Sequence, residues 1–146
     1  MKVIFISGPY RAANHWEIER NIFDAREWAA EIWSMGAVAY CPHANTAHFD
    51  GLCPDDVWLG GNLEMLRRCD AILMMKLWRV SEGACAEREL AITMGLPVFY
   101  SLCGITNWLI RCDRESDNLE RGGADATEPS GNAGQLKGGE CATVGG

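Results

Sequence analysis

Residues 70–100, DAILMMKLWRVSEGACAERELAITMGLPVFY, carry the pattern that decides the fold. The segment 71–75 is a short apolar run of the kind that forms a buried strand. Ser81 supplies a helix N-cap, and the apolar residues after it recur at helical spacing as far as Met94. Residues 97–100 then provide another strand. The stretch therefore predicts a strand, a helix and a second strand, the repeating unit of a parallel sheet.

Glu87 lies on the apolar stripe of this predicted helix, three residues after Ala84 and three before Leu90. Its charged neighbours Arg88 and Glu89 point toward a face that water can reach. A carboxylate against apolar surface needs partners or takes up a proton, and such perturbed groups are concentrated at functional sites. The periodicity fits equally well a helix-edge glutamate that reaches solvent or pairs with an arginine.

The rest of the chain continues the alternation of strand and helix. Residues 2–7 form an apolar run rich in Val, Ile and Phe, which is typical of a parallel strand covered on both faces, and 37–41 form another. Further helices are expected over 16–35, from Asp55 or Asp56 onward, and over 104–111. This order predicts a flavodoxin-like or Rossmann-like three-layer α/β sandwich, with a parallel sheet of about four or five strands.

Length and composition indicate one folded domain followed by a C-terminal tail. The chain has 146 residues, enough for an ordinary domain, and 48% of them are hydrophobic. It contains no apolar run that could span a membrane and no signal peptide, so we expect a soluble cytoplasmic protein without a membrane partner. Residues 113–146 hold half of the sixteen glycines and few large aliphatic side chains. We therefore expect a domain over 1–112 and a disordered acidic Gly-rich tail over 113–146.

Charge and cysteine usage exclude several classes of partner. The formal net charge of −7 disfavours polymeric nucleic acid, because phosphate backbones need clustered Lys and Arg. Seven cysteines without a CxxC pair argue against a zinc ribbon and against a secreted disulfide framework. Cys41, His43, His48 and Cys53 could be drawn as a metal site. Such ligands scattered in a loop are more often a buried thiol and hydrogen-bonding imidazoles, so no metal is expected.

The loop after the first strand is a candidate ligand loop that comprises Ser7, Gly8, Pro9, Tyr10 and Arg11. Glycine permits an unusual backbone and proline fixes the turn, at the strand end where open α/β sheets bind ligands. The loop matches neither the dinucleotide nor the Walker phosphate-binding pattern, and a plain strand-to-helix turn is the structural alternative. His43 directly follows the second strand, where it either reaches a ligand or braces its own loop.

Motifs in a specific order run through residues 1–101: I-S-G-P-Y-R, C-P-H, C-D-A-I-L-M, a tryptophan, S-x-G-A-x-x-E and G-x-P-V-F-Y. This series resembles the nucleoside 2-deoxyribosyltransferase-like proteins and is also similar to the 2-deoxynucleoside 5-monophosphate N-hydrolases among them. The resemblance implies an enzyme that needs no cofactor. It would cleave the N-glycosidic bond of a 2-deoxynucleoside or its 5′-monophosphate, by hydrolysis or by base exchange.

The resemblance also implies roles for single residues. Glu87 would be the nucleophile that attacks C1′ of the deoxyribosyl group. Ser81, with Gly83 beside it, would hold the 5′ end of the substrate at the start of its helix. A serine at this position is typical of the monophosphate hydrolases and favours a 5′-monophosphate, with Arg11 and Arg79 as added positive charge. The alternative is that Ser81 only caps its helix.

Two positions depart from the family pattern. Asn62 stands where the family has an aspartate, so it can orient the sugar or the base but cannot deliver a proton at neutral pH. Phe5 stands where the family has a tyrosine, so a hydroxyl is lost. A non-catalytic nucleotide-binding or sensing module of the same fold is therefore the alternative function.

Two further expectations concern a tryptophan near the ligand and the oligomeric state of the protein. Trp78 could stack on the base of the substrate, although a tryptophan beside a strand end is more often part of the core. By resemblance, the protein is expected to be a homo-oligomer whose partner is a small nucleoside or nucleotide.

Overall fold

The computed structural model describes residues 1–123. Two compact units divide the chain, Met1–Asp113 and Arg114–Gly146, and the sheet and the candidate site lie in the first. The prediction of a disordered tail falls largely on residues 124–146, which lie outside the described part of the chain.

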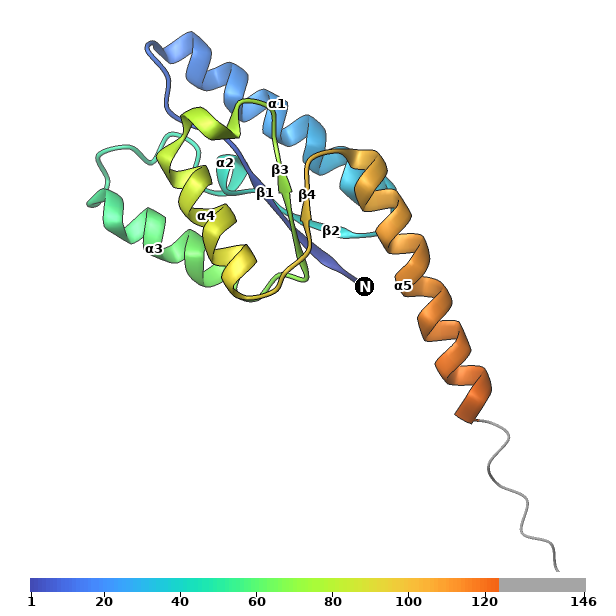
Figure 1. Ribbon diagram of the computed structural model, residues 1–146. Coiled ribbons are helices and arrows are strands. Elements are labelled where there is room, and N and C mark those ends of the chain that lie inside the picture. Colours follow the sequence, from blue (N-terminus) through green and yellow to red (C-terminus); the bar gives the residue numbers. More distant parts are fainter. Residues whose placement is uncertain (124–146) are drawn as a thin grey trace, which may run out of the picture. The chain divides into compact units, whose positions relative to one another are not determined.

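A parallel sheet forms the centre of the first unit (Figure 1). Its strands are β1 (Val3–Ser7), β2 (Val38–Tyr40), β3 (Ala71–Met74) and β4 (Val98–Phe99). They lie in the order β2-β1-β3-β4, and every pair is parallel. This is the beginning of the flavodoxin-like strand order, in which the chain turns from one direction to the other between β1 and β3. The predicted α/β fold with a parallel sheet is confirmed.

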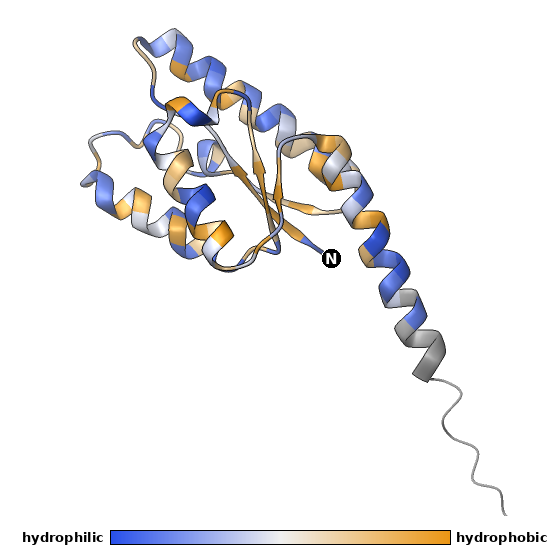
Figure 2. Cartoon of the chain, viewed as in Figure 1, coloured by the Kyte–Doolittle hydropathy of each residue, from blue (hydrophilic) through white to orange (hydrophobic). Residues whose placement is uncertain are grey.

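Helices cover both faces of the sheet, as the three-layer prediction requires. One face packs on α1 (His15–Ser34) and on the beginning of α5 (Leu102–Gly123). The other packs on α3 (Asp55–Leu66) and α4 (Glu82–Thr93). Figure 2 shows mainly hydrophobic strands between helices whose colours alternate, which is typical of amphipathic helices. Among residues 1–123, no helix combines the length and the apolar character needed to cross a membrane.

The alternation of side chains along β1 assigns its residues to the two faces. Ile4 and Ile6 belong to the core beneath α1, whereas Phe5 belongs to the core beneath α3 and α4. Because successive side chains of a strand point to opposite faces, Ser7 is on the same face as Phe5. The register pairs Ser7 with Met74 at the carboxyl end of β3. The last residue of β1 is thus directed toward α4.

The predicted helix that carries Glu87 is confirmed, together with its cap. Ser81 accepts a hydrogen bond from the Ala84 amide at 3.2 Å, and α4 begins at the next residue. Gly95 follows the helix with a φ of 72°, a backbone conformation that glycine adopts without strain. Both ends of α4 therefore form as local sequence dictates.

Two short helices were not expected. Residues 42–45, which we expected in a polar loop, form the single-turn helix α2 (Pro42–Asn45). Pro42 occupies its first turn, where a missing amide hydrogen costs nothing. The turn η1 (Trp78–Val80) follows β3, after Leu77 with a φ of 63°.

The last helix differs from the prediction in length. We expected it to end near Arg111 and the disordered tail to begin at Asp113, but α5 extends to Gly123. Residues 113–121 contain no glycine or proline and several good helix formers, which explains why the helix continues.

Candidate functional site

A cavity of about 460 Å³ lies at the carboxyl edge of the sheet, between the loops after β1 and β2 and the N-terminal parts of α3 and α4. Its volume falls within the range that small-molecule sites occupy. Its lining comprises Gly8, Pro9, Tyr10, Arg11, Pro42, His43, Thr46, Phe49, Asp50, Asp55, Trp58, Leu59, Asn62, Val80, Ser81, Glu82, Gly83, Ala84 and Glu87.

The cavity brings together most of the residues expected to form a site. Those that line it are Gly8, Pro9, Tyr10, Arg11, His43, Asn62, Ser81, Gly83 and Glu87. Ser7 is fully buried behind the lining, and Trp78 lies elsewhere. The residues come from segments far apart in the sequence, so the parallel topology, which gathers the carboxyl ends of β1 and β2 at one edge, assembles the site.

Glu87 lines the cavity and accepts a hydrogen bond from Ser7. The Ser7 hydroxyl donates to Oε2 of Glu87 at 2.6 Å, and Ser7 itself has no exposed surface. Burial raises the pKa of Glu87 to about 7, while the bond from Ser7 acts in the opposite direction. Glu87 is therefore a carboxyl group that changes charge near neutral pH, as catalytic acids, bases and nucleophiles often do.

Gly8 allows the loop after β1 to pass close to β3. A Cβ atom at this position would lie 2.8 Å from both Cβ and Sδ of Met75, closer than atoms of real side chains approach. Met75 is itself buried, and its amide donates to the Ser7 carbonyl at 2.8 Å. Glycine is thus needed here for space next to the candidate nucleophile.

His43 braces the loop after β1 and lines the cavity as well. Its Nε2 lies 3.1 Å from the Pro9 carbonyl, which can only accept, so Nε2 carries the proton. Burial lowers the pKa of His43, so the ring is neutral at pH 7. Its Nδ1 is buried and has no hydrogen-bond partner among the described residues.

Two polar pairs join the loop after β1 to the segment that leads into α3. The Tyr10 hydroxyl donates to Oδ2 of Asp50 at 2.9 Å and accepts from the His48 amide at 3.2 Å. Arg11 forms an ion pair with Asp55. No other Lys or Arg of the described chain lines the cavity, so its lining combines a single guanidinium, already paired, with the carboxyl groups of Asp50, Asp55, Glu82 and Glu87.

An aromatic wall was missed by the sequence analysis. The rings of Phe49 and Trp58 lie with their centroids 5.7 Å apart, and both line the cavity. Trp58 precedes Asn62 by one helical turn on α3, so the two share a helix face. The four-residue spacing from Asn62 could have identified Trp58 as a candidate site residue from the sequence.

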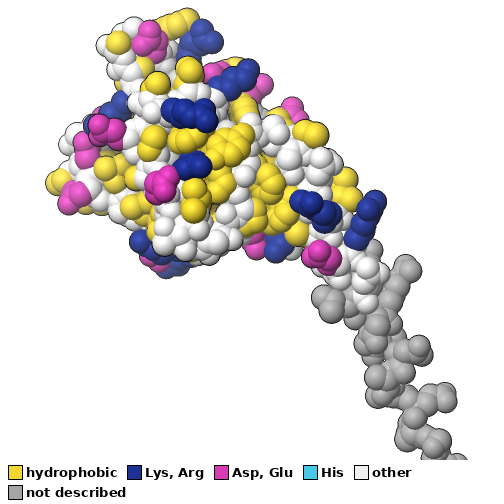
Figure 3. Space-filling model, viewed as in Figure 1, with side chains coloured by type: hydrophobic (Ala, Val, Ile, Leu, Met, Phe, Trp, Pro, Cys, Tyr) yellow, Lys and Arg dark blue, Asp and Glu magenta, His cyan; other side chains and the backbone are white. Residues whose placement is uncertain are grey.

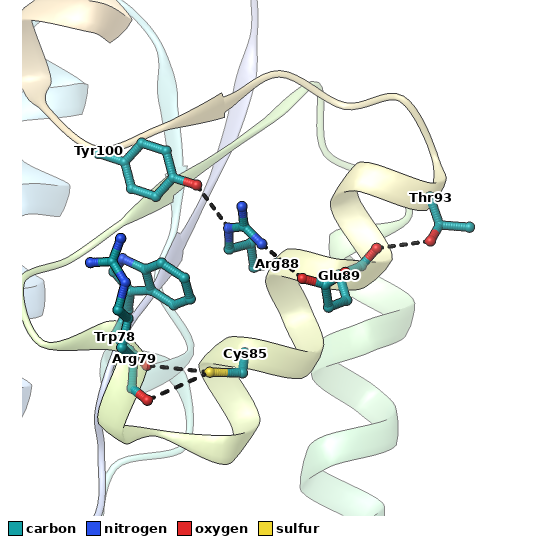
Figure 4. A network of polar contacts seen from close by, with 7 residues as sticks. All are labelled: Trp78, Arg79, Cys85, Arg88, Glu89, Thr93 and Tyr100. Carbon is teal, nitrogen blue, oxygen red and sulfur yellow. Dashed lines mark hydrogen bonds and ion pairs between the residues drawn. The ribbon is translucent and has the colours of Figure 1, made fainter.

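The aromatic residue that we did expect is directed elsewhere. Trp78 packs on the core beneath α4, and its ring centroid lies 6.0 Å from that of Tyr100. The guanidinium groups of Arg79 and Arg88 lie 4.6 and 5.1 Å from the same ring centroid (Figure 4). In Figure 3, basic side chains stand among hydrophobic ones over this region. Trp78, which we expected beside the base of the substrate, is thus not among the residues that line the cavity, and the Arg79 guanidinium stacks on its ring.

Asn62 lines the cavity from α3, and its side-chain amide makes no hydrogen bond to the described residues. It is therefore available to a ligand hydroxyl or a base edge. Phe5, the other departure, is fully buried with its ring 5.5 Å from that of Tyr40, so Ser7 is the β1 residue whose hydroxyl reaches Glu87. Within residues 1–123, no group of three or more His, Cys, Asp or Glu side chains is arranged to hold a metal ion.

Comparisons with known proteins find similar solved structures. One is a 2-deoxyribosyltransferase from Leishmania mexicana, with 23% sequence identity and a TM-score of 0.49 over 67% of this chain and 62% of that chain. Another is a 2-deoxyribosyltransferase from Bacillus psychrosaccharolyticus, with 15% identity and a TM-score of 0.49 over 66% of this chain and 69% of that chain. The chain thus spans about 62% of the length of the first enzyme.

No curated protein matches the chain. A family model described as "Domain of unknown function (DUF4406)" matches residues 2–100, which include the whole sheet and all of the cavity. The chain belongs to this DUF4406 family.

Proposed function

We propose that this protein cleaves the N-glycosidic bond of a 2-deoxynucleoside or its 5′-monophosphate, with Glu87 as the nucleophile. The observation that carries the proposal is the place of Glu87, which lines a cavity of ligand size and accepts a hydrogen bond from a buried serine. A carboxylate in such surroundings interacts strongly with positive charge, because little water screens it. The order of motifs from I-S-G-P-Y-R to S-x-G-A-x-x-E supports the same chemistry.

The reaction begins when ionised Glu87 forms a bond from a carboxylate oxygen to C1′. The bond from C1′ to the base nitrogen breaks, its electron pair leaves with the base, and the base takes a proton from solvent. Positive charge develops at C1′ and the ring oxygen in the transition state, and the remaining carboxylate charge stabilises it. The oxygen of a water molecule, or a nitrogen of a second base, then bonds to C1′. The carboxylate is released, and the attacking group loses its extra proton to solvent.

Other cavity residues fit the parts of this substrate. Phe49 and Trp58 provide an aromatic wall for the base. Asn62 would orient a sugar hydroxyl or a base edge, and Ser81 with Gly83 would contact the 5′ end.

The charges of the cavity favour a neutral 5′ end. Glu82 lines the cavity beside Ser81, Arg11 is paired with Asp55, and Arg79 is stacked on Trp78. A phosphate would therefore meet carboxylates without an unpaired guanidinium among the lining residues. These charges outweigh the preference for a monophosphate that the serine at position 81 suggested, so the free nucleoside is the substrate that we favour.

The experiment is chromatography of the free base released from deoxynucleosides and their 5′-monophosphates, with and without an acceptor base. We expect release by the wild type and a loss of at least about a thousandfold in Glu87→Ala. Glu89→Ala is a matched control, because Glu89 is exposed on the same helix and outside the cavity. Equal release by Glu87→Ala and the wild type would overturn the assignment of the nucleophile.

A non-catalytic nucleoside-binding module is the second candidate, favoured by the amide at Asn62, which cannot protonate a leaving base. It predicts binding of a nucleoside, measured by calorimetry, without release of base from any substrate. A cytoplasmic location stays a prediction from the sequence, and a homo-oligomeric state stays a prediction from the resemblance.

A further inference from the structure

Ser7 is a polar residue at a position where the fold calls for an apolar one. It ends β1 on the face that also carries Phe5, and both residues have no exposed surface. Its side chain is directed toward α4, next to the core that contains Met74 and Ala84. A buried hydroxyl costs free energy unless it is hydrogen-bonded, and its partner here is Glu87.

The backbone of Ser7 is held by β3. The register pairs Ser7 with Met74, and the Ser7 carbonyl accepts a hydrogen bond from the Met75 amide at 2.8 Å. A hydroxyl on this central strand therefore has a defined position relative to the cavity.

The two oxygens of the Glu87 carboxylate differ in their hydrogen bonds, because the Ser7 hydroxyl donates to only one of them. Oε2 accepts from the Ser7 hydroxyl at 2.6 Å, a short distance that is typical of bonds to a charged acceptor. Oε1 accepts no hydrogen bond from the described residues, and Glu87 lines the cavity. Oε1 is thus the oxygen left for a ligand.

We propose that Ser7 is a positioning residue, whose hydroxyl holds Oε2 of Glu87 within the protein and presents Oε1 to the reacting carbon. This inference rests on the proposed function of Glu87. When Oε1 bonds to C1′ and the base leaves with the electron pair of the broken bond, Oε2 becomes the carbonyl oxygen of the ester. A carbonyl oxygen still accepts from a hydroxyl, so Ser7 serves the free carboxylate and the ester alike.

Burial raises the pKa of Glu87, and the bond from Ser7 lowers it, because a donor to the charged form stabilises the carboxylate. The titratable or charged groups that share the cavity with Glu87 are Tyr10, Arg11, His43, Asp50, Asp55 and Glu82. None of these is hydrogen-bonded to Glu87, whereas Ser7 is.

The test is a titration of Glu87 by carbon-13 NMR of glutamate side-chain carboxyl groups in the full chain. Glu87→Gln identifies the resonance by its absence. We expect Ser7→Ala to raise the pKa of Glu87 by about one pH unit above its value near 7, the effect of losing one bond to a charged acceptor. Ser101→Ala is the control, because Ser101 bonds to the Gly104 amide on an exposed turn outside the cavity.

A second variant keeps the test informative if Ser7→Ala does not fold. Ser7→Cys keeps the size of the side chain and a weak donor, and it should give a pKa between those of the wild type and Ser7→Ala. An unchanged or lower pKa in both variants overturns the proposal.

Kinetics give an independent readout. In Ser7→Ala, the acid limb of the pH profile of kcat should move to higher pH by the same amount, with a smaller change in KM. If the wild type releases no base while Ser7→Ala still raises the pKa of Glu87, the proposed reaction fails and the control of Glu87 by Ser7 stands. If base is released and neither the profile nor the pKa moves, the role of Ser7 fails and the proposed reaction stands.

Discussion

Arg11, in the loop after β1, is ion-paired with Asp55 at the first position of α3, 44 residues along the chain. Asp55 therefore competes with an anionic ligand for the guanidinium of the cavity. The ion pair leaves Glu82 unopposed at the end of the cavity formed by Ser81 and Gly83.

The first prediction concerns the charge of the substrate. Glu82→Gln should strengthen binding of a deoxynucleoside 5′-monophosphate by about three- to tenfold at low salt, because a repulsive charge in a solvated cavity is removed. Binding of the uncharged deoxynucleoside should change little, and both are measured by titration calorimetry. Glu89→Gln carries the same charge change outside the cavity and should leave both affinities unaltered. Equal effects of the two variants would show that Glu82 does not act at the ligand.

The second prediction concerns stability against pH. The pKa of Glu87 is raised by burial from 4.5 to about 7, so between these values the folded protein holds a proton that the unfolded chain has released. The contribution of Glu87 is fully present below pH 4.5 and is lost as pH rises through 7, an upper limit of about 3 kcal/mol. Glu87→Gln should abolish this decline. Urea unfolding of both proteins from pH 5 to pH 8 measures it, and parallel curves would show that the decline does not come from the buried carboxyl group of Glu87.

The third prediction concerns the close approach at Gly8. Gly8→Ala should destabilise the protein by about 1–3 kcal/mol, because the added Cβ would lie 2.8 Å from the Cβ of buried Met75. Gly61→Ala is the matched control, since that glycine lies within α3 with no atom within 4 Å of the added Cβ. It should be neutral or stabilising by about 0.5–1 kcal/mol. Urea unfolding distinguishes the two, and a similar effect of both would remove the steric argument.

The fourth prediction separates two tryptophans. Trp58→Leu should weaken binding of a deoxynucleoside by about tenfold or more, because base stacking contributes about 1–3 kcal/mol, and leave binding of deoxyribose unchanged. Trp78→Leu should instead lower the unfolding free energy, because Trp78 packs on the core beneath α4 and on Tyr100. Calorimetry and urea unfolding of each variant test the pair. Weaker nucleoside binding by Trp78→Leu, with unchanged binding by Trp58→Leu, would show that Trp78 rather than Trp58 contacts the base.

Local patterns predicted the fold and the burial of Glu87. The apolar runs at Val3–Ser7 and Ala71–Met74 and the cap at Ser81 were recognisable, because each depends on neighbouring residues. The place of Glu87 on an apolar stripe indicated a buried carboxyl group for the same reason.

Contacts between distant segments could not be predicted in this way. The bond from Ser7 to Glu87 joins residues 80 positions apart and depends on how β1 faces α4. The direction of Trp78 depends on Leu77, whose positive φ turns the chain into η1. The sequence gives no indication of that turn, because leucine rarely adopts a positive φ. The wall of Phe49 and Trp58 likewise exists only once the segment between β2 and β3 has folded over the sheet edge.

The central position of β1 has an evolutionary consequence. Ser7 and its bond to Glu87 rest on a strand that is paired along both edges, whereas the aromatic wall comes from the segment between β2 and β3. Substitutions in that segment reshape the space for a base without touching the bond between Ser7 and Glu87. Related chains can thus diverge in ligand preference while they inherit the same pair of Ser7 and Glu87.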